Sequence, residues 1–123
     1  DAEHSWRRSM HREYKAGRIK MPGIENAIAA AQDAMRSIGV GVLSVDEFEA
    51  DDLIATLVEH ARADQCRAVM MSQDKDLHQC LVEGEVTQLL KATRERTKES
   101  RGARLVAHWR STKDFRAQYG IEP

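Results

Sequence analysis

The sequence has little of what builds several common kinds of protein. Its two cysteines, Cys66 and Cys80, have no metal-ligand spacing and no secretory signal accompanies them, so we expect free thiols and a reducing, cytoplasmic location. No apolar run approaches the roughly 18 residues that a membrane span requires, so we expect no membrane partner. The formal net charge is only -1 over 123 residues, which argues against bulk attraction to nucleic acid.

Several catalytic motifs are also missing. Ser72 has no Gly-x-Ser-x-Gly frame, which disfavours a nucleophilic triad, and no Gly-x-x-x-x-Gly-Lys loop is present to cradle a nucleotide triphosphate. The histidines are dispersed, and none pairs with a second His or Cys at zinc spacing, so surface or structural roles are expected for them. They are His4, His11, His60, His78 and His108.

The small net charge hides a strong segregation of charge. Basic residues crowd positions 7 to 20 and 91 to 116, whereas the acids form tight clusters. In the first basic stretch the cations are interleaved with Trp6 and Tyr14, a pattern that suits a strand of nucleic acid, with cations for phosphate and rings for bases. A solvated terminal arm is an equally good interpretation of that stretch. The cations are Arg7, Arg8, Arg12, Lys15, Arg18 and Lys20.

Hydrophobic periodicity predicts an alternation of helices and strands over the first 82 residues, and therefore an α/β class with a mainly parallel sheet. The predicted helices cover Ile24–Ile38, ended by Gly39, then about Glu49–Asp64, a short piece near Leu77–Val82, and Thr112–Tyr119, with Thr112 as the cap and Gly120 as the end. The predicted strands cover 40–45, 68–72, 86–90 and 103–109, with a turn at 83–85 and a polar connection over 93–102.

The first acidic cluster is Glu49-Ala50-Asp51-Asp52. Apolar residues at spacings of 3, 4, 7, 8 and 11 from Ala50 predict a helix, so the three acids fall in its first turn. One interpretation is that they simply complement the positive end of the helix dipole. Taken alone, this cluster does not indicate a site.

The second cluster, Asp74-Lys75-Asp76, follows a short apolar run over 68–72 that is typical of a strand buried in a parallel sheet. Carboxylates just beyond the carboxyl end of such a strand lie where open α/β sheets bind their ligands. Together the two clusters predict a divalent-metal site at that edge. Carboxylate oxygens favour Mg²⁺ over zinc.

These segments resemble a known family. The stretches Glu49–Leu57 (EADDLIATL) and Ser72–Leu77 (SQDKDL) are similar to the two acidic signatures of the 5′ nuclease family, which includes 5′-3′ exonucleases, flap endonucleases and the amino-terminal domain of bacterial DNA polymerase I. Trp6-Arg7-Arg8, followed by Glu13–Arg18 (EYKAGR), is similar to the family's Phe-Arg-His … Tyr-Lys-Ala-Asn/Gly-Arg segment, and Thr112–Pro123 is similar to the helix leading toward its helix-hairpin-helix region. The resemblance covers nearly the whole chain.

The resemblance implies roles for particular residues. It gives metal-ligand positions to Asp1, Glu49, Asp51, Asp74 and Asp76, and to Asp52 the position of an additional carboxylate. Arg7, Tyr14, Lys15 and Arg18 fall in the arch region, which in the family holds the 5′ end of DNA. Lys15 and Arg18 there correspond to a lysine and an arginine that act on the scissile phosphate.

The resemblance also implies a fold and an activity. Residues 1–123 would form a single partial domain of the three-layer, PIN-like 5′ nuclease fold, with 1–20 as the basic arm and 21–123 as the α/β core. The implied activity is a 5′-3′ exonuclease or flap endonuclease that uses two Mg²⁺ (or Mn²⁺) ions on DNA with a 5′ end or flap. We expect a monomer, with a fused or separate DNA polymerase as a candidate partner.

Two departures from the family pattern keep alternatives open. The family's first strand with its aspartate, and its later Gly-Asp-x-x-Asp-Asn segment, have no counterpart in these residues, and the connection over 93–102 is longer than the usual turn. A non-catalytic nucleic-acid-binding fragment is therefore one alternative. A PIN-type metal-dependent ribonuclease is another, although the arm from Tyr14 to Arg18 speaks against it because such ribonucleases need no arch.

Overall fold

The computed structural model describes residues 5–17, 19, 21–96 and 103–123. The chain divides into two compact units, residues 1–50 and residues 51–123, and each is described by itself. No helix among the described residues is long and apolar enough to cross a membrane.

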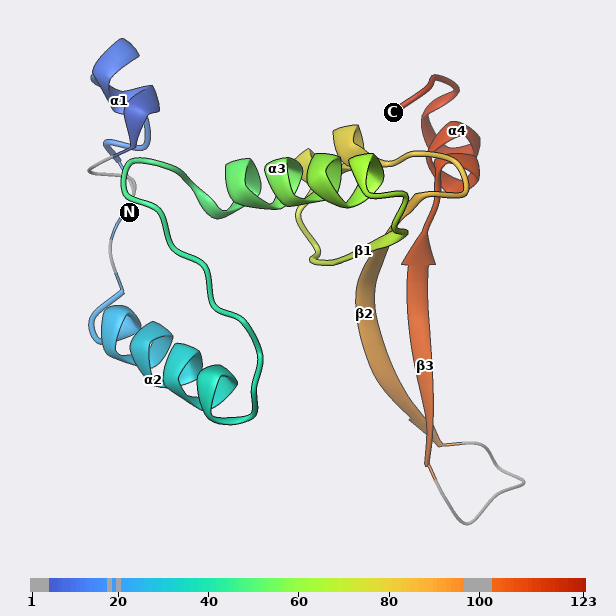
Figure 1. The fold of residues 1–123 in the computed structure, drawn as a ribbon, viewed down its shortest axis with the longest axis horizontal. Helices are drawn as coiled ribbons and strands as arrows, with labels where there is room; N and C mark the ends of the chain where they lie inside the picture. Colours follow the sequence, from blue (N-terminus) through green and yellow to red (C-terminus); the bar gives the residue numbers. More distant parts are fainter. Residues whose placement is uncertain (1–4, 18, 20, 97–102) are drawn as a thin grey trace. The chain divides into compact units, whose positions relative to one another are not determined.

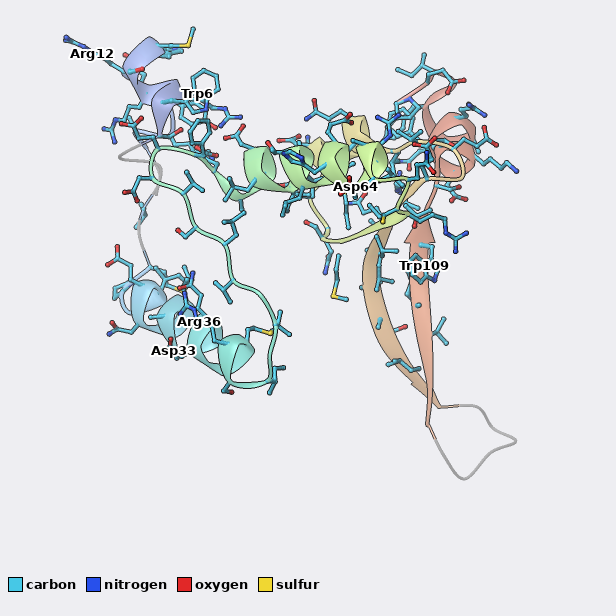
Figure 2. The ribbon with its side chains drawn as sticks, in the orientation of Figure 1. Trp6, Arg12, Asp33, Arg36, Asp64 and Trp109 are labelled. Atoms are coloured by element: carbon cyan, nitrogen blue, oxygen red, sulfur yellow. The ribbon has the colours of Figure 1, made fainter. Side chains whose placement is uncertain are left out.

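The described residues of the first unit form two helices, α1 (Trp6–Met10) and α2 (Ile24–Ser37), shown in Figure 1. The predicted helix over residues 24–38 is confirmed as α2, which follows Gly23 at φ 79° and is followed by Gly39 at φ 82°. Both glycines occupy the left-handed region, which costs glycine little because it has no Cβ. On the surface of α2, Arg36 and Asp33 form an ion pair at 2.9 Å (Figure 2).

Two features of the first unit differ from the sequence predictions. The start of the basic stretch, with Arg7 and Arg8, lies in the short helix α1, which Ser5 caps by accepting a hydrogen bond from the Arg7 amide on its hydroxyl. The strand predicted over 40–45 is wrong, because these residues form no strand ladder with any described part of the chain. An apolar run becomes a strand only when a neighbouring strand accepts and donates its main-chain hydrogen bonds.

The second unit holds the sheet. Helix α3 (Ala50–Ala63) leads through a turn to β1 (Ala68–Met71), then to the 3₁₀ helix η1 (Lys75–Cys80), β2 (Val86–Arg96), β3 (Ala103–Arg110) and helix α4 (Thr112–Tyr119). The strand order is β1-β2-β3, with β1 parallel to β2 and β2 antiparallel to β3 (Figure 1). The α/β class is confirmed, and the described sheet is mixed.

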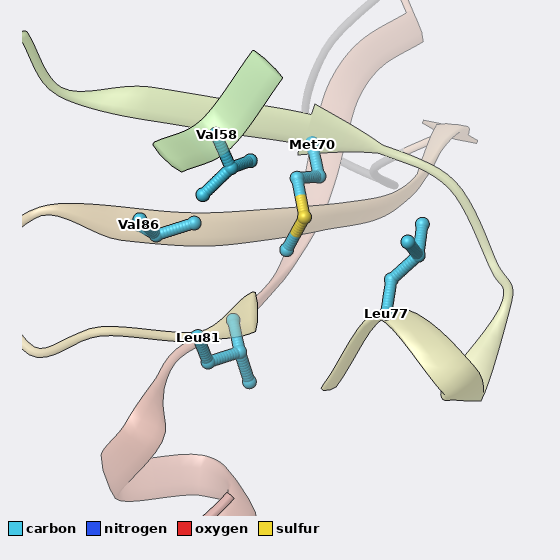
Figure 3. Close-up of a cluster of buried hydrophobic side chains, with 5 residues drawn as sticks. All are labelled: Val58, Met70, Leu77, Leu81 and Val86. Atoms are coloured by element: carbon cyan, nitrogen blue, oxygen red, sulfur yellow. The ribbon is translucent and has the colours of Figure 1, made fainter. Parts of the chain in front are cut away.

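A cluster of buried apolar side chains joins α3, β1, η1 and β2 (Figure 3). Its members are Val58, Met70, Leu77, Leu81 and Val86. They come from elements up to 28 positions apart in the sequence, and they fix η1 against the sheet. Burying such side chains is the main favourable term in folding, at about 1.5–3 kcal/mol for each fully buried one.

Strand β1 is buried on one face only. The sequence predicted a strand buried on both faces, but Met70 is 4% exposed while its neighbours Val69 and Met71 are 56% and 80% exposed. Within the second unit β1 is an edge strand with one neighbour, and α3 covers a single face of it. Burial therefore follows the two-residue alternation of side chains along a strand.

Strands β2 and β3 are longer than predicted, and helix α4 has a different cap residue. Strand β2 extends to Arg96, so residues 93–96 of the connection predicted over 93–102 belong to the strand, and its remainder, 97–102, lies outside the described residues. Helix α4 is capped by Ser111 rather than Thr112. The Ser111 hydroxyl and main-chain N–H both donate to the Asp114 carboxylate, at 2.7 and 2.8 Å, and the Asp114 amide donates to Ser111 Oγ at 3.4 Å, which is a capping box.

The core cluster leads to a stability prediction. Leu77→Ala should lower the free energy of unfolding by about 2–5 kcal/mol, because it removes a 2%-exposed side chain and leaves a cavity. Leu105→Ala is the matched control, since that side chain is 70% exposed, and it should change stability by no more than about 0.5 kcal/mol. Urea denaturation followed by circular dichroism measures both values. Equal losses would show that Leu77 is not part of the core.

The capping box leads to a pH prediction. Hydrogen bonds from Ser111 hold the pKa of Asp114 below its ordinary value, so the stabilisation is complete above about pH 4 and is lost as the pH falls through the folded-state pKa. Ser111→Ala should cost about 1 kcal/mol at neutral pH. The loss should shrink in acid, in denaturation curves measured between neutral pH and acid. Lys113→Ala, in the same turn, is the control and should show neither effect; a pH-independent loss for Ser111→Ala would contradict the assignment.

Candidate metal and nucleic-acid site

Lys15 and Glu49 form a direct ion pair in the first unit. The Lys15 ammonium donates to Glu49 Oε2 at 2.5 Å, and the Tyr14 hydroxyl donates to the same oxygen at 3.4 Å. Lys15 has φ 53°, in the left-handed region that most residues avoid, and its Nζ lies 5.0 Å from the centre of the Tyr14 ring. A residue predicted to contact phosphate is thus bonded to a residue predicted to bind metal.

The electrostatics of this pair favour its charged form. Burial alone would raise the pKa of Glu49, but the hydrogen bond and charge of Lys15, a hydrogen bond from Ser5 and the charge of Arg7 lower it below its ordinary value. The pKa of Lys15 is raised, first by its hydrogen bond to Glu49, against the opposing effect of burial. Glu49 is therefore a carboxylate that cations already surround. Arg7 itself lies with its guanidinium carbon 4.9 Å from the centre of the Trp6 ring.

The second acidic cluster forms a tight turn at the end of β1, in the second unit. The Asp74 amide donates to Ser72 Oγ at 3.0 Å, and the Asp76 amide donates to Asp74 Oδ1 at 3.0 Å, so Asp74 caps η1. Leu77, the next residue, is buried in the core. The acids are exposed while the residue that follows them is anchored, which is the arrangement expected of a ligand-binding turn at the carboxyl end of a strand.

Sequence reasoning missed Gln88, on the neighbouring strand β2. Its side chain is fully buried, and Nε2 donates to the main-chain oxygens of Ser72 and Asp74 at 3.0 and 2.8 Å. The one available signal was a polar residue two positions after Val86, and therefore on the same face of the predicted strand.

Asp51 and Asp52 stand in the first turn of α3, as predicted. Asp51 Oδ1 accepts a hydrogen bond from the Asp52 amide at 3.0 Å. Figure 1 shows α3 and β1 running in opposite directions, so the start of the helix and the end of the strand lie at the same end of the second unit. Asp51 and Asp52 thus stand at the start of α3, whereas Asp74 and Asp76 follow the end of β1, at the start of η1.

No three His, Cys, Asp or Glu side chains within the described ranges come close enough together to hold a metal ion. The donor types nevertheless fit Mg²⁺, because carboxylate oxygens are the ligands it prefers. Two of the predicted site residues, Asp1 and Arg18, lie outside the described residues.

His78 also borders the acidic turn, in a structural role. Its ring packs edge-on against Phe115 at 5.5 Å between ring centres and lies 6.4 Å from Tyr119. Burial and the charge of Arg110 lower the pKa of His78, against the opposing charges of Asp74 and Asp76. A neutral ring packed on aromatic side chains agrees with the structural role predicted for the histidines.

Comparison with known proteins shows which family this chain belongs to. Residues 1–110 match the model of the family described as 5′-3′ exonuclease, N-terminal resolvase-like domain. The chain is 36% identical over 80 residues to a protein named flap endonuclease Xni from Psychromonas ingrahamii, which covers 64% of this chain and 30% of that protein. It is 39% identical over 79 residues to flap endonuclease Xni from Aeromonas salmonicida, covering 63% and 30%.

A third relative is DNA polymerase I from Treponema pallidum, at 42% identity over 67 residues, covering 54% of this chain and 7% of that protein. The chain therefore spans less than a third of the flap endonucleases it resembles. The family match is more extensive: it covers most of the chain and includes both acidic clusters and the basic arm. This chain belongs to the 5′-3′ exonuclease family, in its N-terminal resolvase-like domain.

Proposed function

We propose that the protein is a metal-dependent 5′-3′ exonuclease or flap endonuclease that hydrolyses phosphodiester bonds near the 5′ end of DNA. The observation that carries the proposal is the family match over residues 1–110, which includes both acidic clusters. Relatives named flap endonuclease and DNA polymerase I support it. The chemistry of the acidic turn and of the Lys15–Glu49 pair agrees with it.

Asp51, Asp74 and Asp76 would supply oxygen ligands for Mg²⁺ or Mn²⁺, and the family resemblance adds Asp1, Glu49 and Asp52 to the ligand set. When bound, a pair of such ions activates water and neutralises charge at the leaving oxygen. The chain's own contribution is to hold the carboxylates. The short turn from Ser72 to Asp76 is closed by its own hydrogen bonds and anchored by Leu77, so these acids need little reordering to accept a cation.

Lys15 would act on the phosphate. The hydrogen bond to Glu49 raises the pKa of Lys15, which favours the charged form, and the ion pair holds the ammonium beside a carboxylate until substrate binds. Arg18 would share this role, as the resemblance implies. Tyr14, beside Lys15, offers a ring on which a base can stack, worth about 1–3 kcal/mol. Arg7 would add a contact to the DNA backbone.

One observation favours a second candidate, a nucleic-acid-binding module without catalysis. It is the absence, among the described side chains, of three potential ligands within reach of one ion. The two candidates differ in what removal of an acid does, because an acid that holds a metal matters for cleavage whereas a basic arm alone carries binding.

The test uses the full-length protein and a 5′-flap DNA. Asp74→Asn should abolish cleavage in Mg²⁺, because it removes a metal-holding charge, while binding in Ca²⁺ should persist or tighten as repulsion of the DNA falls. Single-turnover cleavage and equilibrium binding measure the two effects. Asp64→Asn is the control, an exposed aspartate outside both acidic clusters, and should cleave like the parent. Undiminished cleavage by Asp74→Asn would refute the enzyme proposal, and a parent that binds the flap but never cleaves it would favour the binding module.

Lys15→Ala should behave differently from Asp74→Asn. Cleavage should slow by about 10²–10³-fold, the range for loss of one electrostatic donor to a transition state. The salt dependence of DNA binding should become shallower by about one unit of slope. Arg36→Ala, which also removes one paired cation from the first unit, is the control and should alter neither quantity. Identical behaviour of the two variants would show that Lys15 contributes only to net charge.

A further inference from the structure

Gln88 is a polar side chain in a position that should be apolar. It is fully buried on β2, two residues after Val86, which is also fully buried. Burying an amide costs free energy unless its donors and acceptor are hydrogen-bonded, so a methionine or leucine of similar size would fill the same space more favourably. Gln88 Oε1 is buried and has no hydrogen-bond partner among the described residues. The benefit of glutamine at this position must therefore come from the donor end of its amide.

That donor end makes two long-range hydrogen bonds to the acidic turn. Gln88 pairs with Met70 in the parallel register of β1 and β2, and its side chain reaches beyond the end of β1. There Nε2 donates to the main-chain oxygens of Ser72 and Asp74, which are 16 and 14 positions away in the sequence. The main chain of β2 adds one bond, from the Ser72 amide to the Leu89 oxygen at 3.1 Å.

The other hydrogen bonds of the turn are local and exposed. They join Asp74 to Ser72 and Asp76 to Asp74, two residues apart in each case. Such bonds shape the turn, but they do not attach it to the sheet. The bonds from Gln88 do, because they tie the peptide oxygens on either side of Gln73 to a buried side chain of the next strand.

We propose that Gln88 is a positioning residue that fixes the direction of the Asp74 and Asp76 carboxylates for binding a divalent cation. The inference rests on the proposed function, because it assigns a purpose to an acidic turn that would bind metal. Gln88 would act through its hydrogen bonds to the main chain of Ser72 and Asp74, and not by contact with metal or substrate.

The test compares Gln88→Met with Ser111→Ala in the full-length protein. Gln88→Met keeps the length of the side chain and removes both donors. Ser111→Ala is the control, since it lowers stability by removing a helix cap, its side-chain hydrogen bonds are to Asp114, and it is not part of the buried cluster that anchors the turn. Amide hydrogen exchange reports the order of the turn, and calorimetric titration with Mn²⁺ alone reports metal binding.

We expect Gln88→Met to speed exchange at the Asp74 and Asp76 amides by about tenfold, the scale of one or two ordinary hydrogen bonds. Mn²⁺ affinity should fall by about 10–100-fold, as for other residues that do not bind the metal but orient its ligands through hydrogen bonds. Ser111→Ala should lower the denaturation midpoint and leave both readouts near the parent values. If Ser111→Ala weakens Mn²⁺ binding as much as Gln88→Met does, the effect is one of general stability and the proposal is wrong.

Failure of this proposal can be told from failure of the proposed function. A parent protein that cleaves flap DNA and binds Mn²⁺, with a Gln88→Met variant that matches it in exchange and affinity, overturns the role of Gln88 alone. A parent protein that neither binds Mn²⁺ nor cleaves DNA overturns the function, and with it any role of Gln88 in metal binding, whatever the exchange data show.

Discussion

The packing of Leu77 into the core of the second unit is the constraint on which the candidate site depends. Leu77 joins Met70 and Val86 in one buried cluster, so the chain must turn back immediately after β1. Five residues, from Ser72 to Asp76, are left to make that turn, and their exposed acids are held at the end of the strand. Gln88 reinforces the same turn from β2. A hydrophobic contact thereby confines a segment that carries two exposed acids to a short turn at the end of the strand.

In the first unit, an ion pair compensates for the burial of a carboxylate. Glu49 is a largely buried carboxylate, and a buried carboxylate needs a partner or it takes up a proton. Lys15 is that partner, and the Tyr14 hydroxyl donates to the same carboxylate. The hydrogen bond and charge of Lys15 lower the pKa of Glu49. In the proposed enzyme this pair has a second use, because a lysine held next to a carboxylate is already ordered and charged when the phosphate of a substrate arrives.

Local signals in the sequence predicted much of the fold correctly. Helices α2 and α3 lie within a residue or two of their predicted ends, because apolar periodicity and flanking glycines report local preferences. The predictions failed where an element depends on a partner. Residues 40–45 have the composition of a strand but no ladder, and β1 is buried on one face where two were predicted. The cap of α4 moved by one residue to Ser111, whose hydroxyl and amide both reach Asp114.

The sequence by itself determined the acidic clusters, their places at the start of a helix and the end of a strand, and the family to which they belong. These follow from residue types at short spacings, which the chain carries with it in any conformation. Only the tertiary structure decided that Gln88 holds the Ser72–Asp76 turn and that Lys15 pairs with Glu49. Those partners are 14 and 34 positions apart, and strand register and chain path, rather than local pattern, bring such residues within hydrogen-bonding distance.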